Sequence, residues 1–279
     1  MTRILIATLL SVGALWSSSA TAADPAMKSF VYKTTPQGAL SLNAYLPADW
    51  KAGEQRPAIV FFFGGGFKKG RVSQFEPQSL YLAGRGMVAI CADYRVKSRH
   101  DVAPDACVED AKSAIRWVRQ HAAELGIDPD RVVGAGGSAG GNLAACTGIC
   151  PGLDAADEDQ SISSRPNVLV LFNPLLKFDE KHTVEKLDGD EKRARAISPT
   201  LHVREESPPT LILFGTDDKL LVQGEEFLAR SAELGHRAEL YLAEGVGHGF
   251  FNRSPWTEKT LDRVDEFLVS VKYLPPPAQ

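Results

Sequence analysis

The feature that most constrains the fold is the alternation of short apolar runs with segments of helical periodicity. The runs are AIVFFF (58–63), MVAICADY (87–94), RVVGAGG (131–137), VLVLFN (168–173), TLILFG (210–215) and AELYLA (238–243). Several are apolar throughout, which is typical of strands buried on both faces of a parallel sheet. Helical patterns lie between them, and strands that alternate with helices predict a doubly wound α/β sheet.

Further segments complete this prediction. FVYKT (30–34) and LSLNAYL (40–46) are joined by Pro36-Gln37-Gly38, which predicts an antiparallel first pair in a sheet of about eight strands. Helices are expected from Pro104 to Leu125 and over residues 142–149, 225–234 and 255–271. The polar segments 151–166 and 177–195 are the candidate insertions, and because both are short, any lid is small or absent.

The N-terminus has the pattern of an export signal. Arg3 precedes the apolar run ILIATLLSVGALW, and Ala20-Thr21-Ala22 forms an A-x-A cleavage site. We therefore expect residues 1–22 to be a signal peptide and residues 23–279 to form one domain. The apolar run is shorter than the ~20 residues that a membrane-spanning helix needs, so the predicted location is periplasmic or secreted, without a stable membrane anchor.

Composition and missing motifs argue against several classes of protein. The net charge is −4, and the sequence has no long block of like charge. This disfavours nucleic-acid binding, which normally requires a basic patch. The four cysteines lack the spacing of a zinc site and are expected to be buried thiols, although a Cys91–Cys107 bridge stays open. The sequence contains neither H-E-x-x-H nor a phosphate loop ending in Gly-Lys-Ser/Thr, so we expect no metal and no cofactor.

A candidate nucleophile lies at the end of one apolar run. In VVGAGGSAGG (132–141) a buried strand enters a Gly-x-Ser-x-Gly turn centred on Ser138, and a helix follows. Small neighbours permit a strained turn that raises the serine hydroxyl above the sheet. Serine is a weak nucleophile at its own pKa and requires a base that is oriented by an acid. Strand, turn and helix in this order make Ser138 the candidate nucleophile.

The sequence also offers the base and the acid. Asp217 and Asp218 directly follow the apolar run TLILFG, where catalytic groups of open α/β sheets are found. His248 lies in the glycine-flanked loop EGVGHGFF after the last apolar run, a setting that the other histidines lack. The residues alone leave the choice between the two aspartates open.

The stretch FFFGGGFKKG (61–70) runs from a buried strand into three glycines. Glycine costs more backbone entropy on folding than any other residue, so this loop must need bare backbone. A serine nucleophile requires amide donors for the oxyanion of its tetrahedral intermediate. One is expected from Ala139, the residue after the nucleophile, and the others from this loop. Lys68 and Lys69 are expected to face solvent.

The chain from about Pro57 to Phe251 resembles the hormone-sensitive-lipase-like esterase branch of the α/β-hydrolases, including bacterial acetyl-esterase and carbohydrate-esterase relatives. GGSAGGNLA (136–144), DYRV (93–96) and SPPTLILFGTDD (207–218) carry the resemblance, and the chain order Ser, Asp, His agrees with it. The resemblance implies an α/β-hydrolase fold and ester hydrolysis through an acyl-enzyme. It selects Asp218 as the acid and Gly65 and Gly66 as the remaining oxyanion donors.

Two residues depart from the family pattern. Phe63 occupies the place of the histidine in the family's H-G-G-G motif, so packing must hold the loop where relatives are thought to use hydrogen bonds. Gly137 replaces the aspartate of G-D-S-A-G-G, which is a milder change.

The expected function is that of an exported serine esterase. Its substrates would be short-acyl esters, either small molecules or carbohydrate-borne, such as O-acetyl groups on polysaccharide. Two alternatives stay open: a serine peptidase of the same fold and a non-catalytic binding protein on this scaffold. The sequence leaves the natural substrate and the oligomeric state undetermined.

Overall fold

A computed structural model describes residues 26–277. The strands are β1 (Ala26–Thr35), β2 (Gly38–Leu46), β3 (Arg56–Phe62), β4 (Val88–Ala92), β5 (Ile127–Gly137), β6 (Val168–Phe172), β7 (Thr210–Gly215) and β8 (Ala238–Ala243). They form one eight-stranded sheet in the order β1-β2-β4-β3-β5-β6-β7-β8. β2 pairs antiparallel with both β1 and β4, and the other neighbours are parallel. The predicted fold class is confirmed.

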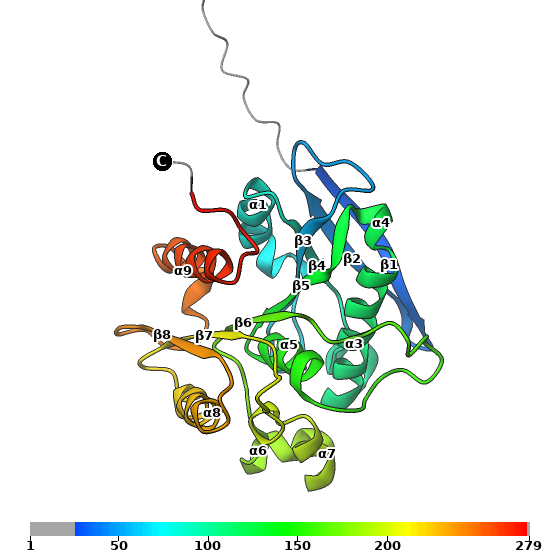
Figure 1. Cartoon of the computed structure of the whole chain (residues 1–279). Coiled ribbons are helices and arrows are strands. Elements are labelled where there is room, and N and C mark those ends of the chain that lie inside the picture. The colour runs from blue at the N-terminus through cyan, green and yellow to red at the C-terminus, as the bar shows by residue number, and fades with distance from the viewer. Residues whose placement is uncertain (1–25, 278–279) are drawn as a thin grey trace, which may run out of the picture.

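Helices cover both faces of the sheet (Figure 1). The longer ones are α1 (Glu76–Gly84), α3 (Pro104–Gln120), α5 (Ala139–Ile149), α8 (Leu221–Glu233) and α9 (Trp256–Ser270). The short ones are α2 (Lys97–His100), α4 (Ala122–Leu125), α6 (Lys181–Val184) and α7 (Glu191–Ala196). The 3-10 turns are η1 (Val72–Phe75), η2 (Glu185–Leu187), η3 (Pro199–Leu201) and η4 (Phe250–Asn252).

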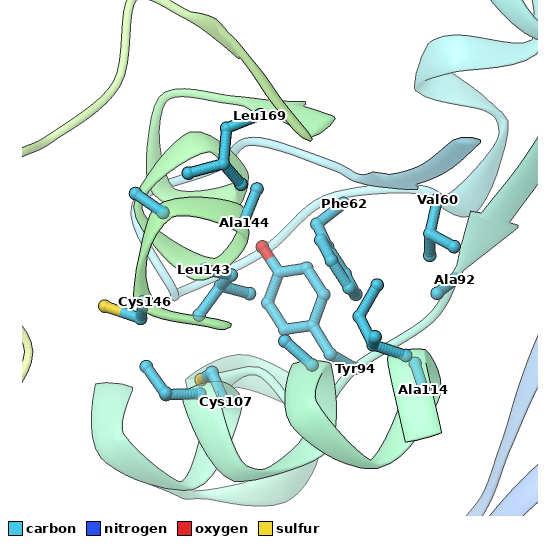
Figure 2. Packing of buried hydrophobic residues seen from close by; sticks show 14 of the residues in the cluster. Val60, Phe62, Ala92, Tyr94, Cys107, Ala114, Leu143, Ala144, Cys146 and Leu169 are labelled. Atoms are coloured by element: carbon cyan, nitrogen blue, oxygen red, sulfur yellow. The ribbon is translucent and has the colours of Figure 1, made fainter. Parts of the chain in front are cut away.

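The buried side chains form two clusters, one on each side of the sheet. The larger cluster joins the sheet to α3, α5 and α8, and the smaller joins it to α1 and α9. Figure 2 shows part of the larger cluster, in which Tyr94 lies among Phe62, Leu143 and Cys107. The fully buried strands β4, β6 and β7 are those expected from continuous apolar runs.

Element boundaries differ from the predicted ones by a few residues. β5 begins at Ile127 rather than at Arg131, and α8 begins at Leu221 rather than at Glu225. α9 begins at Trp256, one residue after the proline that we expected at its first position. The two candidate insertions are short, as expected: 151–166 has neither helix nor strand, and 177–195 contains α6, η2 and most of α7.

The four cysteines are buried free thiols. Cys91 on β4 belongs to the smaller cluster and lies 3.2 Å from Ser79 Oγ, whereas Cys107 on α3 belongs to the larger one. The two thiols lie on opposite faces of the sheet, so the Cys91–Cys107 bridge that the sequence left open does not form.

The predicted signal peptide lies outside the described residues. Within 26–277, no helix combines the length and apolarity needed to cross a bilayer.

Candidate active site

Ser138 lies on a strained turn between β5 and α5. Its φ of 54° is in the left-handed region, which is rare for residues other than glycine. Flanking glycines make the turn possible: a Cβ on Gly136 would lie 2.4 Å from Gly140 O, and one on Gly140 would lie 2.0 Å from Phe62 O. The turn therefore packs directly against the end of β3. This is the geometry expected of a nucleophile raised above the sheet.

His248 and Asp218 complete a hydrogen-bonded chain with Ser138. His248 Nε2 lies 2.8 Å from Ser138 Oγ, and His248 Nδ1 lies 2.7 Å from Asp218 Oδ2. Asp218 is buried and its Oδ1 accepts a hydrogen bond from the Leu220 amide, whereas Asp217 is exposed. The structure thus brings together the three residues that the sequence suggested, and it places Asp218, not Asp217, at the histidine.

The histidine loop is attached to the turn after β7. The Asp217 amide donates to Val246 O at 3.0 Å, and the Gly245 amide donates to Thr216 Oγ1 at 2.9 Å. A Cβ on Gly215 would lie 2.0 Å from Val246 O, so only glycine permits this approach. These contacts explain how residues 30 positions apart, Asp218 and His248, are held within hydrogen-bond distance.

Asn173 is a site residue that the sequence analysis missed. It follows β6, and its Nδ2 lies 3.3 Å from His248 Nε2 while its Oδ1 accepts from the Gly249 amide at 3.1 Å. It is fully buried and has a positive φ of 37°. The available signal was a polar side chain at the carboxyl end of a buried strand, the position where site residues of α/β sheets cluster.

The glycine loop after β3 lies against the nucleophile. A Cβ on Gly64 would lie 3.3 Å from Ser138 Cβ, and a Cβ on Gly65 would lie 1.8 Å from Lys69 O. Gly65 and Gly66 both have positive φ, 137° and 65°. Among residues 26–277, the amides of Gly65, Gly66 and Ala139 donate to no protein acceptor. These are the three amides that the sequence analysis selected as oxyanion donors.

Phe63 is held by aromatic packing. Its ring stacks on Tyr94, with centroids 4.1 Å apart and planes inclined by 18°. Tyr94 Oη donates to Phe63 O at 2.7 Å. On the other side, a Cβ on Gly70 would lie 2.1 Å from Phe63 Cδ2, so this glycine leaves room for the ring. Aromatic packing and a hydrogen bond from Tyr94 together anchor the loop at Phe63, where packing alone was expected. Lys68 and Lys69 are exposed as expected.

The second departure, Gly137, also has an aromatic explanation. A Cβ at this position would lie 2.6 Å from Phe251 Cζ and 3.2 Å from Phe75 Cζ. Phe75 and Phe251 stack with centroids 5.4 Å apart, and both contact Phe172. An aspartate at 137 would meet these rings, so in this chain the aromatic cluster requires glycine.

The site opens into a small cavity. Ser138, Asn173, His248 and the glycine loop line a volume of about 320 Å³. A hollow of about 490 Å³ shares Gly65 and Gly66 with it and is bordered by Lys68. A second hollow of about 810 Å³ shares Gly64 and Gly65 and runs past Gln74 to Asn252. The His248 side chain is 43% exposed, so a ligand reaches the site directly from solvent.

A hydroxyl on a strand-to-helix turn, a histidine that bridges it to a buried aspartate, and a glycine loop with free amides define an α/β-hydrolase site. In the described part of the chain, no group of three or more His, Cys, Asp or Glu side chains is placed to hold a metal ion.

Comparisons with known proteins agree with this class. The BD-FAE family model matches residues 42–171. A thermophilic esterase from Thermogutta terrifontis, esterase 2, is 48% identical, with a TM-score of 0.85, over 90% of this chain and 95% of that one. The same esterase phosphonylated by sarin superposes with a TM-score of 0.86 at 46% identity, over 91% of this chain and 98% of that one. The chain belongs to the hormone-sensitive-lipase-like esterase branch of the α/β-hydrolases.

Curated relatives are more distant and longer. A probable isoprenylcysteine alpha-carbonyl methylesterase, ICMEL1 of Arabidopsis thaliana, is 29% identical over 246 residues, which cover 79% of this chain and 50% of the relative. Carboxylesterase NlhH of Mycobacterium tuberculosis is 38% identical over 90 residues, covering 32% of this chain and 28% of the relative. The chain thus spans about half the length of ICMEL1 and less of NlhH.

Proposed function

We propose that this protein is a serine esterase that hydrolyses short-acyl carboxylic esters through an acyl-enzyme. The observation that carries the proposal is the continuous chain from Ser138 Oγ through His248 to Asp218 Oδ2, with distances of 2.8 and 2.7 Å. Hydrogen-bond contact between nucleophile and base, with the base oriented by a third group, is the arrangement that activates serine.

The acylation step follows from this geometry. Ser138 Oγ attacks the ester carbonyl carbon while its proton passes to His248 Nε2. Asp218 accepts the hydrogen bond from Nδ1–H and stabilises the imidazolium that forms. The carbonyl oxygen becomes an oxyanion, which receives hydrogen bonds from the amides of Ala139, Gly65 and Gly66. When the intermediate collapses, the alcohol leaves with the proton from His248, and Ser138 carries the acyl group.

Deacylation repeats the sequence with water. His248 removes a proton from a water molecule, the resulting hydroxide attacks the acyl carbon, and the same amides hold the second oxyanion. Collapse returns the proton to Ser138 Oγ and releases the carboxylic acid. Each oxyanion donor contributes roughly 2.7–4 kcal/mol in comparable hydrolases.

The small cavity favours short acyl groups. The volume around Ser138 is about 320 Å³, at the low end of the ~300–1,000 Å³ typical of ligand pockets. Thermogutta esterase 2 has been solved with propionate bound and with butyrate bound. We extend the proposal to O-acetyl groups on carbohydrate, because the hollow beside the site, although mainly apolar in its surface, presents the hydrogen-bonding side chains of Ser73, Gln74 and Asn252.

We also propose that the protein is exported, on the basis of the leader pattern in residues 1–22. Expression of the full chain and of a chain lacking this leader, followed by fractionation, tests the location. Equal retention of both inside the cell would contradict it.

The activity is tested with p-nitrophenyl acetate, butyrate, octanoate and laurate, together with an acetylated xylo-oligosaccharide, using wild-type protein and Ser138→Ala. We expect turnover to be fastest for acetate or butyrate and to be lost in the variant. Turnover of laurate alone would contradict the short-acyl proposal. Cleavage of aminoacyl-naphthylamides would indicate a peptidase, and absence of labelling by a fluorophosphonate would indicate a binding protein.

A further inference from the structure

The peptide that joins Phe63 to Gly64 is clamped at both ends. Its carbonyl oxygen, Phe63 O, accepts from Tyr94 Oη at 2.7 Å. Its amide, Gly64 N, donates to Gln74 Oε1 at 2.6 Å. This peptide directly precedes the amide of Gly65, the first proposed oxyanion donor. Backbone hydrogen bonds also hold the loop beyond this peptide, since the Lys68 and Lys69 amides donate to Gly65 O at 3.1 and 3.2 Å. Because Gly65 has no Cβ and a positive φ, the clamp adds a restraint on the backbone just before the first proposed donor.

We propose that Gln74 is a positioning residue that aims the oxyanion amides of Gly65 and Gly66. Gln74 occupies the Gly64 amide and so excludes it from the oxyanion site, and it fixes the orientation of the peptide plane before the two donors. Phe63 has no polar side-chain atom with which to do this. In the described residues, Gln74 and Tyr94 supply the side-chain hydrogen bonds to the backbone of 63–70.

The same glutamine connects the oxyanion loop to the histidine loop. Gln74 Nε2 donates to Asn252 Oδ1 at 3.1 Å, and Asn252 Nδ2 donates to Gly249 O at 2.9 Å. A row of hydrogen bonds therefore runs from Gly64 to Gly249, the residue next to His248. It holds the proposed oxyanion donors in a fixed position relative to the catalytic histidine.

The aromatic cluster brings the two ends of this row together. Gln74 belongs to η1 and Asn252 to η4, and each is adjacent to one member of the stacked Phe75–Phe251 pair. This stack is possible because Gly137 has no side chain: a Cβ on Gly137 would lie only 2.6 Å from Phe251 Cζ. Gln74 thus lies between the two residues that depart from the family pattern. It hydrogen-bonds to Gly64, which follows Phe63, and it precedes Phe75, whose ring packs against Gly137.

This inference rests on the proposed esterase activity, and its test separates the two. Gln74→Met keeps the length of the side chain and removes both polar atoms. Gln160→Met is the control for catalysis, since Gln160 is an exposed glutamine whose hydrogen bonds, to Ala155, Glu158 and Arg116, involve no residue of the site. The measurements are kcat and KM on p-nitrophenyl acetate, the pH profile of kcat/KM, Tm, and the Ki of a trifluoromethyl ketone. The hemiketal that this ketone forms with the serine carries an oxyanion.

We expect Gln74→Met to lower kcat by about 10- to 100-fold, the scale of a misplaced catalytic group. The ketone Ki should rise by a similar factor, while KM changes less and the pH profile keeps its midpoints because His248 retains Asp218. Gln160→Met should match wild type in kcat, KM and the ketone Ki, although the loss of an Arg116 partner can lower its Tm. Asn252→Leu should have the same effects to a smaller degree, and adding it to Gln74→Met should cause little further loss.

The inference is overturned if Gln74→Met lowers Tm but leaves kcat and the ketone Ki unchanged, since Gln74 would then be only structural. A shifted pH midpoint with an unchanged ketone Ki also overturns it, because Gln74 would then act through His248. If Gln74→Met does not fold, Asn252→Leu replaces it in the test, because Asn252 is exposed and its substitution should not prevent folding. Its kcat and ketone Ki are then compared with those of the wild type. A wild-type protein without esterase activity would instead refute the proposed function.

Discussion

Asp217 and Asp218 are adjacent, yet their environments differ completely. Asp218 is buried with its carboxylate on His248 Nδ1 and on the Leu220 amide, and Asp217 is exposed. An acid that orients histidine must be held and shielded from water, because only then does it fix the tautomer of the imidazole. The Asp218 side chain is only 2% exposed, and this burial distinguishes it from Asp217.

We therefore expect Asp218→Asn to lower kcat on p-nitrophenyl acetate by about ten-thousandfold, since the amide stabilises the wrong tautomer. Asp217→Asn is the control and should retain nearly full activity. Steady-state kinetics on both variants test this. Equal losses in the two would show that the acid role is not specific to Asp218.

A second prediction at this scale concerns Gly137. Gly137→Ala places a Cβ about where the Phe251 ring now lies, so the rings must move. Overpacking of this kind costs about 1–3 kcal/mol in the free energy of unfolding. Urea unfolding measures it, and Phe251→Leu in the same chain should recover part of the loss. A fully stable Gly137→Ala would contradict the tight packing seen here.

At the scale of elements, the 151–166 segment is attached to α3 by charged groups. Lys112 Nζ lies 3.1 Å from Asp154 Oδ2, and Arg116 Nη2 lies 2.5 Å from Asp154 Oδ1. Both cations are buried, with 4% and 5% of their side chains exposed. Burial opposes the charged form of Asp154, but hydrogen bonds from Ser164, Arg116 and Lys112 outweigh it and lower the pKa of this carboxyl.

A carboxyl with a lowered pKa in the folded state stabilises the fold at neutral pH. This contribution is complete above the unfolded pKa of about 3.9 and is lost as pH falls toward the folded value. Asp154→Asn should therefore lower the free energy of unfolding at pH 7 by about 3 kcal/mol, since buried Lys112 loses its carboxylate partner and Arg116 keeps only its ion pair with Glu158. It should also flatten the dependence of stability on pH below about pH 4.

Urea unfolding at several pH values tests this prediction. Asp157→Asn is the control, because Asp157 is exposed in the same segment. If Asp154→Asn and Asp157→Asn had the same stability at pH 7, the ion pairs would contribute nothing measurable.

The elements themselves were largely predictable. Continuous apolar runs located β4, β6 and β7 because strands buried on both faces need apolar residues at every position. Their ends were less predictable: β5 starts four residues early because Ile127 pairs with Arg56 of β3, a contact between distant segments. Local periodicity contains no information about such pairing.

At the scale of the whole molecule, one sheet separates two cores, and the cysteines are distributed between them. Burial raises the pKa of the Cys91 thiol to about 12, and it raises the pKa values of Cys107 and Cys146 as well. Because the thiolate is the reactive form, these groups are expected to be inert in the folded protein.

The native protein should thus react negligibly with Ellman's reagent at pH 8, and the denatured, non-reduced protein should release the equivalent of four thiols. The absorbance of the released thiolate measures both. Fewer than four in denaturant would reveal a disulfide, and fast reaction of the native protein would show that a core opens readily.

The sequence by itself determined the fold class, the turn at Ser138, the loop of His248 and the glycine loop that faces them. These are local patterns, in which burial, strain and bare backbone are encoded by neighbouring residues. The family resemblance had already selected Asp218 as the acid, and the tertiary structure confirms it by placing this carboxylate, and not that of Asp217, on the histidine. Only the tertiary structure decided that Asn173 lies beside His248 and that Gln74 clamps Gly64. Those choices depend on contacts between residues far apart in the chain, such as Ser138 and His248 at a separation of 110, which form only when the strand order places their loops together.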